Sequence, residues 1–83
     1  MRMQTVLNQT INAELAARKL TKAGMAASMG ISNGALYSRL NNSRRWTVDE
    51  IPPAAKYLGM DWTQLVNLAA DRERSQNEKE ASK

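Results

Sequence analysis

The side chains that could do chemistry in this 83-residue chain are cations and amides, because the common catalytic and metal-binding groups are missing. The sequence has no cysteine and no histidine, which removes thiol nucleophiles, imidazole bases and the usual zinc ligands. Asp49 and Glu50 are adjacent carboxylates, but the spacing from Thr47 to Glu50 favours helix capping. We therefore expect no enzyme activity, no cofactor and no metal site.

Positive charge is concentrated in the first half of the chain. Residues 1–46 carry seven basic side chains against one acidic side chain, whereas residues 47–83 carry five against seven. A one-sided charge distribution of this kind is expected for a protein that binds a polyanion. Arg39, Arg44 and Arg45 lie close together in the sequence, around the amides Asn41 and Asn42. They are candidates for phosphate contacts, and a solvated charged turn is the alternative.

The spacing of apolar residues predicts helices and no strands. Leu7, Ile11 and Leu15 recur every four residues, which indicates a first helix over residues 5–19. Capping and periodicity predict four more helices, over residues 22–29, 32–40, 52–59 and from 62 onward. Because prolines remove backbone donors, we expect a separate short turn at 47–51 before the fourth helix.

The segment 22–41, KAGMAASMGISNGALYSRLN, has the features of a helix-turn-helix. Thr21 and Ser32 stand at the positions of N-caps, Ala26 is small enough for close helix contact, and Gly30 suits a left-handed turn. Two short helices that cross at roughly 90–120° need this arrangement. It projects the second of them outward, where a helix can enter a DNA major groove about 12 Å wide.

The sequence resembles the XRE family of Cro- and phage-repressor-like domains over residues 7–68. The resemblance rests on LTKAGMAASMGIS at 20–32, ALYSRLN at 35–41 and AAKYLGMDWTQL at 54–65. It implies an all-α, five-helix, lambda-repressor-like bundle whose third helix reads double-stranded DNA, usually as a homodimer. The chain departs from the family at Arg39, where many members have a buried aliphatic residue, and at the Pro52–Pro53 pair.

The outer face of the third helix is the expected reading surface. With Leu36 and Leu40 inward, a helical wheel turns the opposite side chains outward. The residues expected to read bases are Ser32, Asn33, Gly34, Tyr37 and Ser38. Asn33 can make two hydrogen bonds to adenine, or it can instead cap the helix. The residues expected to contact phosphate are Lys22, Arg39, Asn41, Arg44 and Arg45.

The fifth helix has more apolar side chains than one buried stripe needs, which makes it the candidate dimerisation element. The residues assigned to this role are Trp62, Leu65, Val66 and Ala69. We expect residues 1–70 to form the DNA-binding domain. Residues 71–83 form a charged tail that either extends the fifth helix or is disordered.

These features favour a transcriptional repressor of the phage Cro or short immunity-repressor type, which blocks transcription by occupying an operator. We expect it in the cytoplasm of a bacterial or phage-infected cell, near the nucleoid, because no stretch fits a signal peptide or a membrane span. The alternative is the antitoxin of a toxin–antitoxin pair, which binds and masks a toxin protein. The charged tail is the segment that could wrap such a partner.

Overall fold

The computed structural model describes the backbone of residues 2–81 and the side chains of residues 3–75, and within this part of the chain it contains helices and no strands. The elements are α1 (Arg2–Ala17), α2 (Lys22–Met29), α3 (Asn33–Leu40), the 3-10 helix η1 (Val48–Glu50), α4 (Ile51–Tyr57) and α5 (Trp62–Ala81). The predicted all-α, five-helix fold is confirmed. None of these helices is long and apolar enough to cross a membrane.

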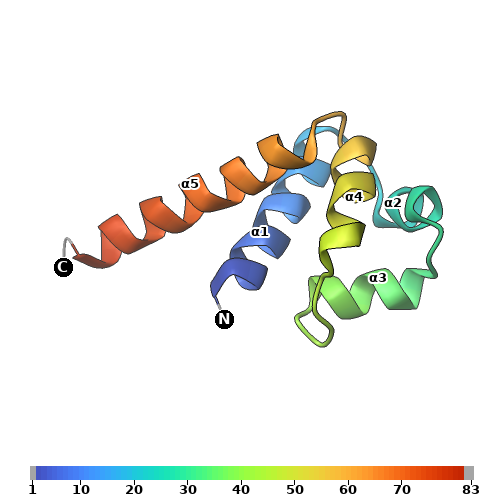
Figure 1. Cartoon of the computed structure of the whole chain (residues 1–83), viewed down its shortest axis with the longest axis horizontal. Helices are drawn as coiled ribbons and strands as arrows, with labels where there is room; N and C mark the ends of the chain where they lie inside the picture. Colours follow the sequence, from blue (N-terminus) through green and yellow to red (C-terminus); the bar gives the residue numbers. More distant parts are fainter. Residues whose placement is uncertain (1, 82–83) are drawn as a thin grey trace.

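The helices surround one core to which every α-helix contributes. Helices α1 and α5 pack along each other, α4 packs on α5, and α2 packs against both α3 and α4 (Figure 1). The buried apolar side chains are Val6, Leu7, Ile11 and Leu15 of α1, Met25 and Ala26 of α2, Leu36 and Leu40 of α3, Ala54 and Ala55 of α4, Leu58 after it, and Leu65 and Ala69 of α5. Helix α3 lies at the lower edge of the molecule in Figure 1, with one side free.

Local capping defines the helix-turn-helix. The Thr21 hydroxyl accepts a hydrogen bond from the backbone N–H of Gly24 at 3.0 Å, and the Ser32 hydroxyl accepts one from Ala35 at 3.1 Å. Between the two helices Gly30 adopts a φ of +74°, and the next residue donates its N–H to the carbonyl of Ala26 at 3.0 Å. The predicted bounds of α2 and the left-handed turn at Gly30 are therefore confirmed.

The two prolines lie where a helix tolerates them. Helix α4 begins at Ile51, so Pro52 and Pro53 occupy its first turn, in which backbone N–H groups have no partner within the helix. The 3-10 helix η1 directly precedes α4 and lies within the short turn predicted at residues 47–51. Gly59, with a φ of +77°, ends the α4 segment.

The last helix continues past residue 70, where the DNA-binding domain was expected to end. Helix α5 continues without a break from Trp62 to Ala81, and its C-terminal end extends away from the body in Figure 1. At its start, the backbone N–H of Asp61 donates to Oε1 of Gln64 at 2.9 Å. Of the two alternatives for the tail, the structure thus has the helical extension as far as residue 81, and no break in the helix marks residue 70.

Candidate nucleic-acid interface

Helix α3 presents one face to solvent because both of its leucines lie on the other face. Leu36 and Leu40 are buried in the core, whereas Asn33, Gly34 and Tyr37 are exposed and Ser38 is half-buried. The helical wheel therefore agrees with the packing of α3 at Gly34 and Tyr37, whereas Ser38, also expected outward, is only partly exposed.

The start of α3 leaves an amide free. Ser32 is the N-cap, so its hydroxyl is already used by the Ala35 N–H, and the amide of the exposed Asn33 is not the capping group. Gly34 follows, and a Cβ built there meets no atom within 4 Å. Packing within the chain therefore does not explain a glycine at this position.

Lys22 and Tyr37 connect the two helices of the motif at their exposed side. The Lys22 ammonium nitrogen lies 5.5 Å from the centre of the Tyr37 ring, within the range of a cation–π contact. The Tyr37 side chain remains exposed in this contact. A predicted phosphate contact and a predicted base contact therefore lie side by side.

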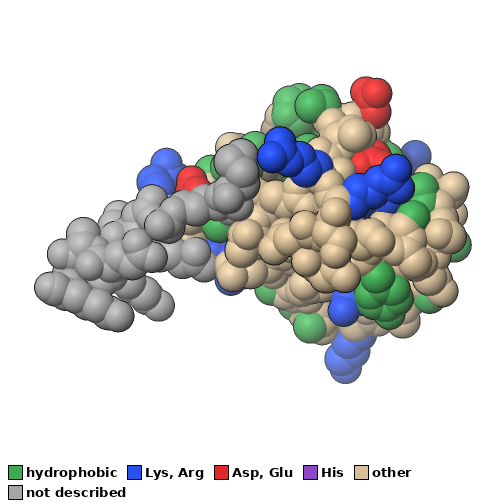
Figure 2. All heavy atoms as spheres, turned by 90° about the horizontal axis from the view of Figure 1, so that it is seen from below, with side chains coloured by type: hydrophobic (Ala, Val, Ile, Leu, Met, Phe, Trp, Pro, Cys, Tyr) green, Lys and Arg blue, Asp and Glu red, His purple; other side chains and the backbone are tan. Residues whose placement is uncertain are grey.

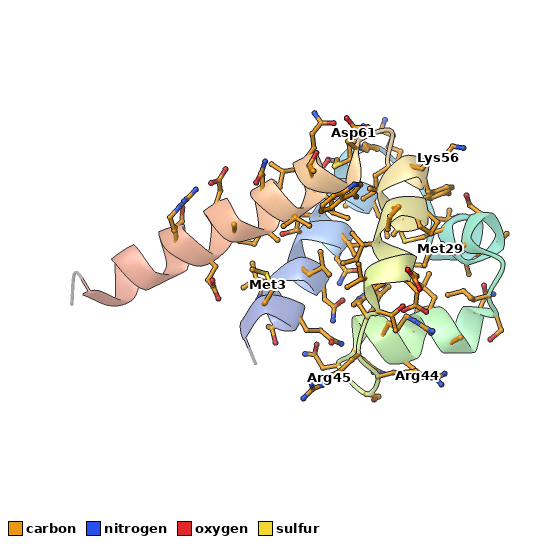
Figure 3. The ribbon with its side chains drawn as sticks, viewed as in Figure 1. Met3, Met29, Arg44, Arg45, Lys56 and Asp61 are labelled. Carbon is orange, nitrogen blue, oxygen red and sulfur yellow. The ribbon has the colours of Figure 1, made fainter. Side chains whose placement is uncertain are left out.

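Arg44 and Arg45 lie on the loop between α3 and η1, which comprises residues 41–47 and is called the α3–η1 loop below. Both side chains are exposed and point away from the body at the end of the molecule where α3 lies, whereas Lys56 and Asp61 lie at the opposite end (Figure 3). Figure 2 faces the α3 end and shows several Lys and Arg side chains on it, with Asp and Glu side chains at one edge. Asn41 is also exposed on this loop, and its Oδ1 accepts the backbone N–H of Ser43 at 3.0 Å.

The prediction that Arg39 contacts DNA phosphate is wrong. The Arg39 side chain is 9% exposed; its Nε donates to Oε2 of Glu50 at 2.9 Å, and its Nη2 donates to the same oxygen. Its Nη1 donates to the carbonyl of Ala35 at 2.7 Å, so the guanidinium is held inside the protein. Arg39 is thus a buried cation of α3, and Glu50 compensates its charge.

This ion pair changes the titration of both partners. Hydrogen bonding to Arg39 holds the pKa of the Glu50 carboxyl below its usual range, against the opposing effect of burial. The same hydrogen bond raises the pKa of Arg39. The other Glu50 oxygen, Oε1, accepts the Thr47 backbone N–H at 2.9 Å, which is the capping contact expected from the sequence.

Two amides of α1, which the sequence did not single out, hold the α3–η1 loop. Gln4 donates to the carbonyl of Arg44 at 2.6 Å, and Asn8 donates to the carbonyl of Arg39 at 2.8 Å. Asn8 also accepts the indole N–H of Trp46 at 2.7 Å. The only signal in the sequence is a polar side chain next to Leu7 on the buried face of α1, and this signal does not identify partners more than thirty residues away.

The residues assigned to dimerisation separate into two groups. Leu65 and Ala69 are fully buried within the chain, so the prediction that they form a dimer interface is wrong. Trp62 is 52% exposed and Val66 is half-buried, and both line a surface groove between η1, α4 and α5. Its remaining lining residues are Val48, Asp49, Ile51 and Pro52.

The fold is similar to that of a solved gene regulator. The crystal structure of the clp gene regulator ClgR from Corynebacterium glutamicum matches with a TM-score of 0.84 over 95% of this chain and 84% of that chain, at 16% sequence identity. No protein-family model and no curated protein matches the sequence. At this identity the similarity establishes the fold, and the function has to be argued from the surface described above.

Proposed function

We propose that the chain is a sequence-specific repressor that binds double-stranded DNA through the α2–turn–α3 unit. In this proposal α3 enters the major groove, Asn33 and Tyr37 contact base edges, and the chain blocks transcription by occupying an operator. No catalytic step and no cofactor is involved. A repressor of this kind acts where the DNA is, in the cytoplasm.

The observation that carries the proposal is the shared orientation of the free face of α3 and the loop cations. Arg44 and Arg45 point outward at the same end as α3 (Figure 3), and Lys22 lies over Tyr37 on that helix. A helix that reads bases needs cations beside it, because phosphate contacts set its register on the duplex. The similarity of the fold to a gene regulator supports DNA-binding regulation in general. The narrower type that we propose, a phage Cro or short immunity repressor, rests on the XRE-like stretches of the sequence alone.

The proposal includes a homodimer on DNA. Two copies that pack through the groove around Trp62 and Val66 would each present one α3 to a half-site, and an operator with an inverted repeat would match this symmetry. The groove is lined mostly by apolar side chains, and one of them, Val48, is 82% exposed. A second copy would remove this apolar surface from water.

The test is a selection from random double-stranded DNA with the full chain at physiological salt. We expect an enriched inverted repeat with half-sites roughly 10 base pairs apart. Asn33→Ala should lower the preference for particular bases, whereas Thr63→Ala, an exposed position of α5, should select the same sequences as the parent. If the parent enriches no sequence, the proposed function is wrong.

A second candidate function, an antitoxin, is favoured by α5. This helix extends beyond the body of the molecule, and its start carries the exposed Trp62, so it offers a surface for a protein partner. Co-expression with the product of the adjacent gene distinguishes the two functions. A stable complex that forms through α5 supports the antitoxin, and its absence together with operator selection supports the repressor.

A further inference from the structure

The α3–η1 loop has no helix or strand, yet side chains from α1 hold it at its start, middle and end. Two of its exposed residues, Arg44 and Arg45, are the cations of the proposed phosphate contacts. A loop that presents such cations binds more tightly if it is already ordered before the DNA arrives, because less conformational freedom is lost on binding. The residue that orders this loop would therefore affect binding without touching DNA.

Asn8 has the contacts that such a residue requires. The residue is 4% exposed, and its Nδ2 donates to the carbonyl of Arg39 and to Oδ1 of Asn42, each at 2.8 Å. Its Oδ1 accepts the indole N–H of Trp46 at 2.7 Å. These partners lie at the end of α3, near the start of the loop and near its end. One side chain of α1 therefore holds both ends of the loop in place.

The chemistry of these contacts requires an amide at residue 8. Two of the partners are acceptors and one is a donor, so a carboxylate at this position would lose both bonds to the acceptors, and an apolar side chain would lose all three. The partners also fix the orientation of the amide, because the reverse orientation would face its oxygen toward two oxygens.

Contacts of Arg44 and Gln4 complete the arrangement. The backbone N–H of Arg44 donates to the carbonyl of Ser38 at 3.0 Å, and its carbonyl accepts Nε2 of Gln4 at 2.6 Å. Both backbone groups of Arg44 are therefore used inside the protein, while its side chain points outward (Figure 3). The direction of this side chain follows from the anchoring of its backbone to α1 and α3.

We infer that Asn8 is a positioning residue for the contact with the DNA backbone. It does not reach DNA itself; it holds the α3–η1 loop so that Arg44 and Arg45 face the phosphates before binding. This inference rests on the proposed function. It adds that the first helix, to which we assign no base contact, contributes to affinity through the loop.

The test compares Asn8→Leu with Thr10→Val in the full chain. Thr10 is equally buried on α1, but its hydroxyl bonds only to the carbonyl of Val6 in its own helix. Affinity for the selected operator is measured at a temperature where circular dichroism shows each variant folded. We expect Asn8→Leu to weaken binding roughly tenfold, the effect of freeing two arginine side chains, and Thr10→Val to bind as the parent does.

A double-mutant cycle separates positioning from a general loss of structure. In the background Arg44→Ala/Arg45→Ala, Asn8→Leu should have no further effect, because the cations it positions are gone. An equal loss in both backgrounds, or no loss in the parent background, would overturn the inference while leaving the proposed function intact. A parent chain that binds no DNA would overturn both.

A second variant decides the question if Asn8→Leu fails to fold. Asn42 has a φ of +68°, a conformation that glycine adopts without strain, so Asn42→Gly removes one acceptor of Asn8 and keeps the loop backbone. We expect a severalfold weaker affinity without loss of thermal stability. Unchanged affinity of this variant would overturn the inference.

Discussion

At the scale of single residues, a substitution of Gly34 tests whether α3 approaches the bases. The free energy of unfolding should rise while the affinity for DNA falls. A Cβ at this position meets nothing within 4 Å, so Gly34→Ala gains helix propensity at no steric cost. We expect a gain of about 0.5 kcal/mol, or roughly 2–4 °C in Tm. The same methyl group would stand between the backbone of α3 and the base edges, so operator affinity should fall.

The matched control for this prediction is Gly30→Ala. Gly30 has a φ of +74° and lies in the turn before α3, so alanine there should destabilise the fold by about 1 kcal/mol. Thermal melts and DNA titrations of both variants separate the two effects. A Gly34→Ala protein that binds the operator as tightly as the parent would show that α3 does not approach the bases through this face.

The salt dependence of binding reports the number of phosphate contacts. Because Arg39 is held by Glu50, the predicted phosphate-contacting cations that remain are Lys22, Arg44 and Arg45. Three contacts predict a slope of log K against log salt of about −2.7 per protomer, and each Arg→Ala change in the loop should reduce its magnitude by about 0.9.

Lys56→Ala is the control for this slope, because Lys56 lies at the end of the molecule opposite the loop (Figure 3). It removes the same charge and should leave the slope as it is. If Arg44→Ala or Arg45→Ala changes the base preference and not the slope, these residues read bases and the phosphate assignment is wrong.

At the scale of elements, the ion pair between Arg39 and Glu50 joins α3 to the η1–α4 segment. Glu50→Gln would leave a buried guanidinium without its counter-charge, so we expect the free energy of unfolding to fall by about 3 kcal/mol. The variant Arg39→Met/Glu50→Leu removes both charges and should lose much less. Urea unfolding measures all three proteins, and an equal loss in the single and the double variant would contradict this reading.

The same pair predicts a dependence of stability on pH. The pKa of Glu50 is lowered in the folded state, so its contribution to stability is complete above the unfolded pKa of about 4.3. This contribution is lost as pH falls through the lowered folded-state pKa. The unfolding free energy of Glu50→Gln should therefore fall less steeply below pH 4 than that of the parent, and parallel curves would contradict the prediction.

The elements themselves were predictable because their ends depend on neighbouring residues. Thr21, Ser32 and Gly30 act on groups within a few positions, and the sequence shows both partners of each contact. The contacts of Arg39 and Asn8 join segments whose distance is set by the fold. The charge of Arg39 therefore predicts a surface cation, and no neighbouring residue indicates the partners of Asn8.

At the scale of the whole molecule, α5 shows the same difference between features set by neighbouring residues and features set by how the helices pack. Periodicity identified an apolar face on this helix, but it could not show which part of that face α1 and α4 cover. The structure buries Leu65 and Ala69 under α1 and α4 and leaves Trp62 and Val66 at the groove beside Val48. Which residues remain for a second copy is thus decided by how the helices pack.

If two copies pack through the groove, a charge at its exposed residue Val48 should prevent self-association. Val48 is 82% exposed, so Val48→Glu should leave the fold intact while placing a second carboxylate next to Asp49 on an apolar interface. We expect the parent to sediment as a dimer and the variant as a monomer, with Thr63→Glu, the same new charge on an exposed position outside the groove, remaining a dimer. The monomer should still protect a single half-site but lose the joint occupancy of an inverted repeat, because each half-site alone must then hold its own copy. If Val48→Glu remains a dimer, the two copies meet elsewhere, and the apolar groove is left for a different protein partner.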